Sequence, residues 1–150
     1  MRAIILGLAA KDRDFFVSLF SPAQDLLIMP ATRVRVFANA AWQDTGISVP
    51  ASHVVKIKQV DMKEHWCTNP DKGPTDANGF APDGIAQEGS LVVGVPFGGL
   101  VATIFPTNST AWVGADGSIA APAAGKLKLG ANDDDHHDNH GSIDFDVTVL

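Results

Sequence analysis

The residues that decide the fold are Asn132-Asp133-Asp134-Asp135-His136-His137-Asp138-Asn139-His140-Gly141. This stretch holds four aspartates, two asparagines and three histidines, and it is closed by a glycine. Residues 126–129 before it and 143–149 after it alternate between polar and apolar side chains. A period of two is typical of strands with one buried face. The sequence therefore predicts two half-buried strands joined by an acidic loop, residues 132–141, that is held at both ends by a sheet.

The acidic loop is rich in oxygen ligands. Four carboxylates this close repel one another, and an acidic run is often only a solvated loop. Here the run is short, lies between strands and includes asparagines, whose side-chain carbonyl groups also bind cations. Ca²⁺ takes roughly six to eight oxygens from carboxylates, amides and backbone carbonyls. We therefore predict a Ca²⁺ site in this loop, with a bland acidic loop as the alternative.

Two other kinds of metal site fit the acidic loop less well. An EF-hand counted from Asp133 would place Asp138 where the turn glycine belongs and Asp144 where the glutamate belongs. Adjacent His136 and His137 suggest a Zn²⁺ or Ni²⁺ site. Neighbouring residues on an extended chain point to opposite sides, so both imidazoles are not expected on one ion. Oxygen ligands remain the prediction.

The rest of the chain also favours short strands. Alternating or apolar runs occur at residues 33–37, 55–58, 91–96 and 100–104, and turn-forming residues separate them. No window shows a helical period. Short strands with frequent Gly and Pro turns predict an all-β fold, an antiparallel β-sandwich. We expect residues 32–150 to form the sandwich and residues 1–31 to be an N-terminal extension that packs on it.

Composition limits the functions to consider. The chain has 150 residues, enough for one domain with a sizeable core, and its formal net charge of −6 offers no basic surface for nucleic acid. No stretch approaches the ~20 apolar residues of a membrane span. The N-terminal apolar run is short and is followed by charged residues 11–14 without a clean cleavage site. We therefore expect no export signal, which places the protein in the cytoplasm or on a non-classical export route.

Several segments in order carry a resemblance to a known family. They are Phe37-Ala38-Asn39-Ala40-Ala41-Trp42-Gln43-Asp44-Thr45-Gly46, Trp66-Cys67-Thr68-Asn69-Pro70, Gly98-Gly99-Leu100-Val101-Ala102-Thr103-Ile104, Gly125-Lys126-Leu127-Lys128-Leu129-Gly130-Ala131-Asn132-Asp133 and Asp138-Asn139-His140-Gly141-Ser142. In this order they resemble the PA-IL (LecA)-like family of calcium-dependent, galactose-binding bacterial lectins, over roughly residues 33–150. The terminal motif is the most specific. Its family form ends Ser-Gly-Ser-Phe, whereas this chain has His140-Gly141-Ser142-Ile143.

The resemblance implies a jelly-roll sandwich, similar to galactose-binding domains, with one Ca²⁺ at its edge. In the family the ion accepts two adjacent sugar hydroxyls, and galactose is favoured through O3 and O4. The implied metal ligands are the side chains of Asp133, Asp138 and Asn139 and the backbone carbonyls of Asn69 and Asp135, or of His136 in place of Asp135. The implied partners are galactose-containing glycans, and a homo-oligomer is expected because lectins of this family are multivalent.

The same resemblance suggests residues that contact the sugar. Asp133 and Asp138 would accept hydrogen bonds from its hydroxyls. The family's His-Pro-x-Gln arrangement is absent, and this region reads Phe80-Ala81-Pro82-Asp83-Gly84. Asp83 would accept a hydrogen bond from a sugar hydroxyl in place of the His and the Gln. Trp66 is the tryptophan expected nearest the site, because it lies beside the loop that contains Asn69, with a place in the core as the alternative.

Two other functions would also use a metal site in the acidic loop. The ion would have a purely structural role if it only tied two loops together. A metal-assisted hydrolase would use His137 or His140 as a base near an open metal position. Ca²⁺ at a sandwich edge is a poor Lewis acid, and no second carboxylate motif is present. We therefore predict a protein that is not an enzyme and has no catalytic residues.

Overall fold

The computed structural model describes residues 30–150, and these form nine β-strands and no helix. None of these described residues belongs to a helix that is long and apolar enough to cross a membrane. The strands are β1 (Thr32–Phe37), β2 (Gln43–Val49), β3 (Val54–Gln59), β4 (Trp66–Cys67), β5 (Leu100–Phe105), β6 (Ser109–Trp112), β7 (Asp116–Ala120), β8 (Gly125–Ala131) and β9 (His140–Val149).

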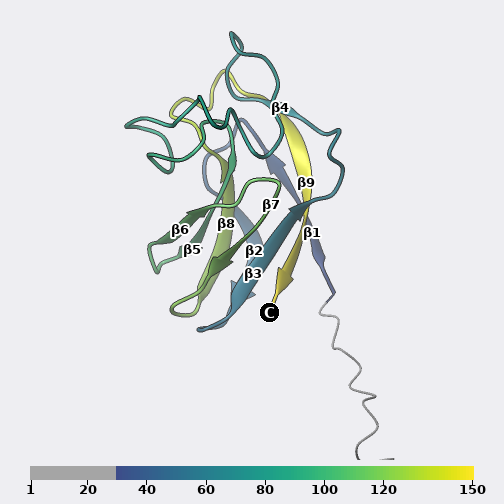
Figure 1. Ribbon diagram of the computed structural model, residues 1–150. Coiled ribbons are helices and arrows are strands. Elements are labelled where there is room, and N and C mark those ends of the chain that lie inside the picture. The colour runs from purple at the N-terminus through teal and green to yellow at the C-terminus, as the bar shows by residue number, and fades with distance from the viewer. Residues whose placement is uncertain (1–29) are drawn as a thin grey trace, which may run out of the picture.

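The strands form two antiparallel sheets that pack face to face (Figure 1). One sheet has the order β1-β9-β3-β7, with the short β4 paired to the start of β9. The other has the order β2-β8-β5-β6. Neighbouring strands in a sheet are mostly distant in sequence, so the chain crosses repeatedly from one sheet to the other. The predicted all-β antiparallel sandwich is confirmed.

The core lies between the sheets and follows the period-two pattern of the strands. In β9, Ile143, Phe145 and Val147 are buried, and Val149 packs against the same core. In β8, Leu127 and Leu129 are fully buried. The other inward residues include Val36, Val55, Ile57, Trp66, Leu100, Ala102, Ile104 and Ile119. The predicted register of the last strand is therefore confirmed, since a slip of one residue would have turned its aspartates inward.

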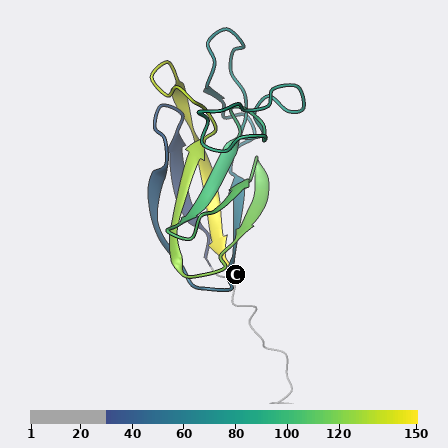
Figure 2. The same ribbon diagram turned by 90° about the vertical axis from the view of Figure 1, so that its left-hand side faces the viewer.

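The strands that flank the acidic loop belong to different sheets. β8 lies in one sheet and β9 in the other, so the loop connects the two layers at one end of the sandwich. The long connection between β4 and β5 lies at the same end, away from the C-terminus (Figures 1 and 2). Residues 68–99 and 132–139 are therefore neighbours in space although they are far apart in sequence.

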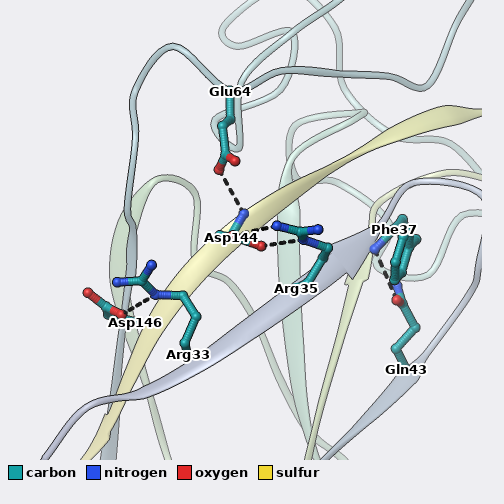
Figure 3. Close-up of polar contacts among 7 residues, drawn as sticks. All are labelled: Arg33, Arg35, Phe37, Gln43, Glu64, Asp144 and Asp146. Atoms are coloured by element: carbon teal, nitrogen blue, oxygen red, sulfur yellow. Dashed lines mark hydrogen bonds and ion pairs between the residues drawn. The ribbon is translucent and has the colours of Figure 1, made fainter.

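The outer face of β9 carries aspartates that pair with arginines of β1 (Figure 3). Arg35 Nε donates to Asp144 Oδ1 (2.7 Å) and its Nη2 donates to Oδ2 (2.9 Å). Arg33 Nε donates to Asp146 Oδ1 (2.8 Å). Each arginine stands directly opposite its aspartate in the antiparallel register. Such cross-strand pairs of opposite charge stabilise a sheet modestly.

The strand predicted at residues 91–96 is wrong: this part of the chain is irregular, and only Pro96 forms an isolated bridge, with Ile85. Gly94 has φ 81°, a left-handed conformation that interrupts an extended strand. The proposed N-terminal extension, residues 1–31, lies outside the described residues except for its last two.

Candidate ligand-binding site at the acidic loop

Two residues predicted as metal ligands lie together inside the acidic loop. The Asn139 side chain is 6% exposed and that of Asp133 is 2% exposed. Asn139 Nδ2 donates to Asp133 Oδ2 (2.7 Å) and to the backbone oxygen of Ala38 (3.0 Å), just beyond β1. The backbone N–H of Asp134 donates to Asp133 Oδ1 (2.7 Å). The start and the end of the loop are therefore joined through a buried carboxylate and a buried amide.

Burial sets the electrostatics of Asp133. It raises the pKa of the Asp133 carboxyl above its usual value, although the hydrogen bonds from Asn139 and from the backbone of Asp134 oppose the rise. Among residues 30–150, the ion pairs are Arg33 with Asp146, Arg35 with Asp144 and His137 with Asp135, so no protein cation pairs with Asp133. Burying an unpaired carboxylate is costly. A cation at this place would offset that cost.

The Asn139 side chain has a second unusual feature. Its Oδ1 is buried and makes no hydrogen bond, while Nδ2 makes two. Because both partners of Nδ2 are acceptors, the orientation of the amide is fixed, and Oδ1 remains the atom without a donor. Buried polar oxygens without a partner are uncommon in folded proteins. A carboxylate and the unpartnered amide oxygen of a neighbouring side chain are donor types that Ca²⁺ prefers, so these two residues fit the ion.

The other loop residues are arranged differently. Asp138 is exposed. Asp135 is also exposed, and its Oδ1 accepts from the backbone N–H of His137 (2.9 Å) and lies 3.0 Å from that ring's Nδ1. These contacts lower the pKa of Asp135. His136 Nε2 lies 3.1 Å from the Ala131 backbone oxygen. Within residues 30–150, no three His, Cys, Asp or Glu side chains gather where they could hold a metal, so a site here depends on amide and backbone oxygens as well.

Asn69 and Asp134 of the acidic loop line the same cleft. The cleft has a volume of about 180 Å³, and its lining residues are Asn69, Lys72, Gly84, Ile85, Gln87, Ser90, Phe97 and Asp134. Asp134 follows the buried Asp133 directly, so the cleft opens next to the carboxylate–amide pair. The Asn69 backbone oxygen already accepts from the N–H groups of Lys72 (3.1 Å) and Gly73 (3.0 Å). That carbonyl is therefore committed to a turn in this conformation.

The two remaining predicted sugar contacts lie elsewhere. Trp66 is 1% exposed; its Nε1 donates to the Gly98 backbone oxygen (2.8 Å) and its ring packs near Phe145. A buried indole presents no face to a ligand, so the prediction that Trp66 contacts the sugar is wrong and the alternative, a place in the core, is confirmed. Asp83 is exposed and precedes Gly84 of the cleft, but it does not line the cleft itself.

Sequence reasoning missed most of the cleft. Lys72, Gln87, Ser90 and Phe97 lie in the connection between β4 and β5, where the sequence predicts only Asn69 and Asp83 as site residues. The missed signal was the turn-forming pair Gly89-Ser90, which precedes the apolar run at 91–96. The apolar run itself predicts a strand. No local pattern in the sequence shows that this run lies beside the acidic loop.

Comparison with solved structures adds to this picture. The chain is similar to the protein described as "EclA N-terminal domain; PllA-like lectin", with a TM-score of 0.57 and 22% sequence identity. The match covers 81% of this chain and 98% of that one. No family model matches the sequence, and no curated protein matches it either. The likeness shows that the chain has the fold of a PllA-like lectin domain.

Proposed function

We propose that this protein is a Ca²⁺-dependent, non-enzymatic lectin that binds terminal galactosides at the acidic loop. The observation that carries the proposal is the buried Asp133 carboxylate beside the unpartnered Asn139 Oδ1. Asp133 and Asn139 would hold the ion with their side-chain oxygens, and the exposed Asp138 and backbone oxygens of the loop would complete its shell. When bound, Ca²⁺ supplies open positions for two adjacent hydroxyls of a sugar.

The surroundings of these residues support a sugar as the ligand. The cleft beside Asp134 combines amide, hydroxyl and charged groups with the aromatic ring of Phe97. A few polar groups on a partly apolar wall are typical of small-molecule sites. The lectin fold of the similar structure favours the same class of ligand. Galactose is proposed over glucose on the resemblance of the terminal loop motif, since its O3 and O4 are arranged as such sites accept.

The acidic residues would also orient the sugar. Asp133 would ligate the ion and accept a hydrogen bond from one hydroxyl, and Asp138 would accept from a neighbouring hydroxyl. Hydrogen bonds to carboxylates are stronger than neutral ones. The site is nevertheless a shallow one at the end of a sandwich, so a single sugar should bind weakly. A homo-oligomer would compensate by presenting several sites at once.

Calorimetric titration of galactose, glucose and mannose, each in Ca²⁺ and in EDTA, tests the proposal. We expect galactose to bind in Ca²⁺ more tightly than glucose or mannose and not to bind in EDTA. Galactose binding that survives EDTA would contradict the mechanism. If Ca²⁺ binds but no sugar does, the ion has only a structural role, which is the second candidate because the Asp133–Asn139 contact already joins the start and end of the loop.

A further inference from the structure

The segment from residue 85 to residue 98 forms no named strand, and one buried side chain connects it to the start of the acidic loop. The Val92 backbone N–H donates to Asn132 Oδ1 (2.9 Å), and Asn132 Nδ2 donates to the backbone oxygens of Val92 (2.9 Å) and Pro96 (3.2 Å). The Asn132 side chain is fully buried. This amide adds to the backbone hydrogen bonds within the segment, in which the Ala86 N–H donates to the Val95 oxygen (2.9 Å) and the Gly94 N–H donates to the Ala86 oxygen (3.0 Å). We refer to residues 85–98 as the 85–98 segment.

Backbone and packing contacts continue the same connection. The Gly98 N–H donates to the Asn132 oxygen (2.8 Å), and the Asn132 N–H donates to the Gly99 oxygen (2.9 Å). Gly89 lies close enough to the acidic loop that an added Cβ would be 3.2 Å from Cβ of Asp134. The 85–98 segment therefore contacts the acidic loop on either side of the buried Asp133. Asn132 holds the 85–98 segment, and the next residue, Asp133, is the proposed ligand of the ion.

The 85–98 segment also supplies hydrogen-bonding side chains to the cleft. Gln87 and Ser90 line it together with Asn69 and Lys72. Gln87 Nε2 donates to the Ile85 backbone oxygen (3.0 Å), which fixes the amide and leaves a second N–H and Oε1 for a ligand. The Ser90 N–H donates to the Gln87 oxygen (3.2 Å), so a turn holds the two residues together. An amide and a hydroxyl in fixed positions suit a polyhydroxylated ligand.

We propose that Gln87 and Ser90 recognise hydroxyl groups of the bound sugar and determine specificity, and that Asn132 is the residue that positions them. The inference rests on the proposed function. Asn132 acts through the 85–98 segment, since its own side chain is buried and spent on backbone groups.

Substituting the cleft residues tests the first part. Gln87→Ala and Ser90→Ala should each lower galactose affinity roughly threefold to tenfold, the range expected for one lost hydrogen bond, and leave Ca²⁺ affinity unchanged. Calorimetry with Ca²⁺ alone and with galactose in saturating Ca²⁺ measures both. If galactose affinity is unchanged in both variants, Gln87 and Ser90 do not contact the sugar and the proposal is wrong.

Asn132→Ala tests the positioning role, with Gln59→Ala as its matched control. Gln59 is 1% exposed, and its amide also makes three hydrogen bonds to the backbone, with Asp61, Glu64 and Ala77, away from the cleft. Both variants should lose similar stability. Only Asn132→Ala should lower galactose affinity, by about tenfold or more, with Ca²⁺ still bound. Equal galactose affinities in the two variants would overturn the positioning role.

Hydrogen exchange on the unmodified protein covers the case in which Asn132→Ala does not fold. Galactose added in Ca²⁺ should slow exchange of backbone amides in the 85–98 segment, including the N–H of Val92. Protection confined to residues 133–139 would overturn the inference while leaving the lectin intact. If the unmodified protein binds no galactose in Ca²⁺, the proposed function itself fails, and this inference fails with it.

Discussion

Two groups of aspartates lie close together in the sequence but in opposite electrostatic settings. On the outer face of β9, Asp144 accepts two hydrogen bonds from Arg35, and the pKa of its carboxyl is lowered mainly by that contact. In the acidic loop, Asp133 is buried beside the neutral amide of Asn139, and burial raises its pKa. The first aspartate has its counter-charge in the protein. The second has none among the described residues.

This difference shows why the number of acidic residues does not identify a cation site. Exposed ion pairs on a sheet are solvated and contribute little to stability. A buried carboxylate without a partner is costly, and a protein gains by filling the site with a cation or by keeping the group protonated. The feature of the loop that points to a cation is therefore the buried, hydrogen-bonded pair formed by Asp133 and Asn139. The exposed Asp135 and Asp138 resemble ordinary surface acids.

The largest expected effect is on Ca²⁺ affinity. Asp133→Ala removes a buried charged ligand and should weaken Ca²⁺ binding by at least ~100-fold. Asp146→Ala, on the outer face, should leave it unchanged. Calorimetric titration with Ca²⁺ measures both. His136→Ala should also leave Ca²⁺ affinity nearly unchanged, and if it instead abolished tight Zn²⁺ binding, a site with nitrogen ligands would be favoured.

Next in size is the effect of Asn139→Ala on stability without metal. The change removes hydrogen bonds to the Ala38 oxygen and to Asp133 Oδ2 and leaves both acceptors buried. The free energy of unfolding in EDTA should fall by about 1–3 kcal/mol. Urea unfolding measures it, with the exposed Asp138→Ala as the control that should change little. Equal losses in the two variants would mean that the buried pair does not stabilise the loop.

A smaller effect is expected for the arginine pair on the outer face. A double-mutant cycle with Arg35→Ala and Asp144→Ala should give a coupling energy well below the loss caused by Asn139→Ala, because Arg35 is 58% exposed. Added salt should reduce the coupling further, since it screens exposed charges. A coupling that is large and independent of salt would remove the contrast between the two groups of aspartates.

The smallest effect is the opposite pH dependence of the two carboxyls in EDTA. Asp133 has a raised pKa, so its contribution to stability falls as pH rises from 3.8 to its folded value. Asp144 has a lowered pKa, so its contribution is full above 3.8 and is lost as pH falls through its folded value. Urea unfolding at several pH values, with Asp133→Asn and Asp144→Asn as references, separates them. For each variant, the difference in stability from the unmodified protein is followed as a function of pH. If that difference changed in the same direction with pH for both variants, the opposite pKa shifts of Asp133 and Asp144 would be contradicted.

The sequence predicted correctly those strands in which polar and apolar residues alternate along the chain. Alternation at 143–149 predicted β9 and its buried face correctly, because a period of two is imposed by the strand itself. It also predicted the acidic loop as a connection between strands. It did not reveal that β8 and β9 lie in different sheets, since pairing between distant strands leaves no local pattern.

The candidate site was predictable only in part, for a related reason. Asp133 and Asn139 were chosen for their residue types, and the structure brings them together. Trp66 was chosen for its place in sequence, but its indole turns into the core, where Gly98 accepts its hydrogen bond. The cleft was missed because it is built from residues 69–97 and 134, which meet only in the folded chain.

Thermal unfolding in Ca²⁺ and in EDTA, on the unmodified protein and on Asp133→Asn, tests the central claim most directly. The substitution keeps the shape of the buried side chain and removes its charge. At a Ca²⁺ concentration 100 times the dissociation constant, the unmodified protein should gain about 2.7 kcal/mol, a rise in Tm of roughly 5–10 °C. Asp133→Asn should show almost no rise. A Tm that is the same in Ca²⁺ and EDTA, or an equal rise in both proteins, would show that Asp133 is not the centre of a calcium site.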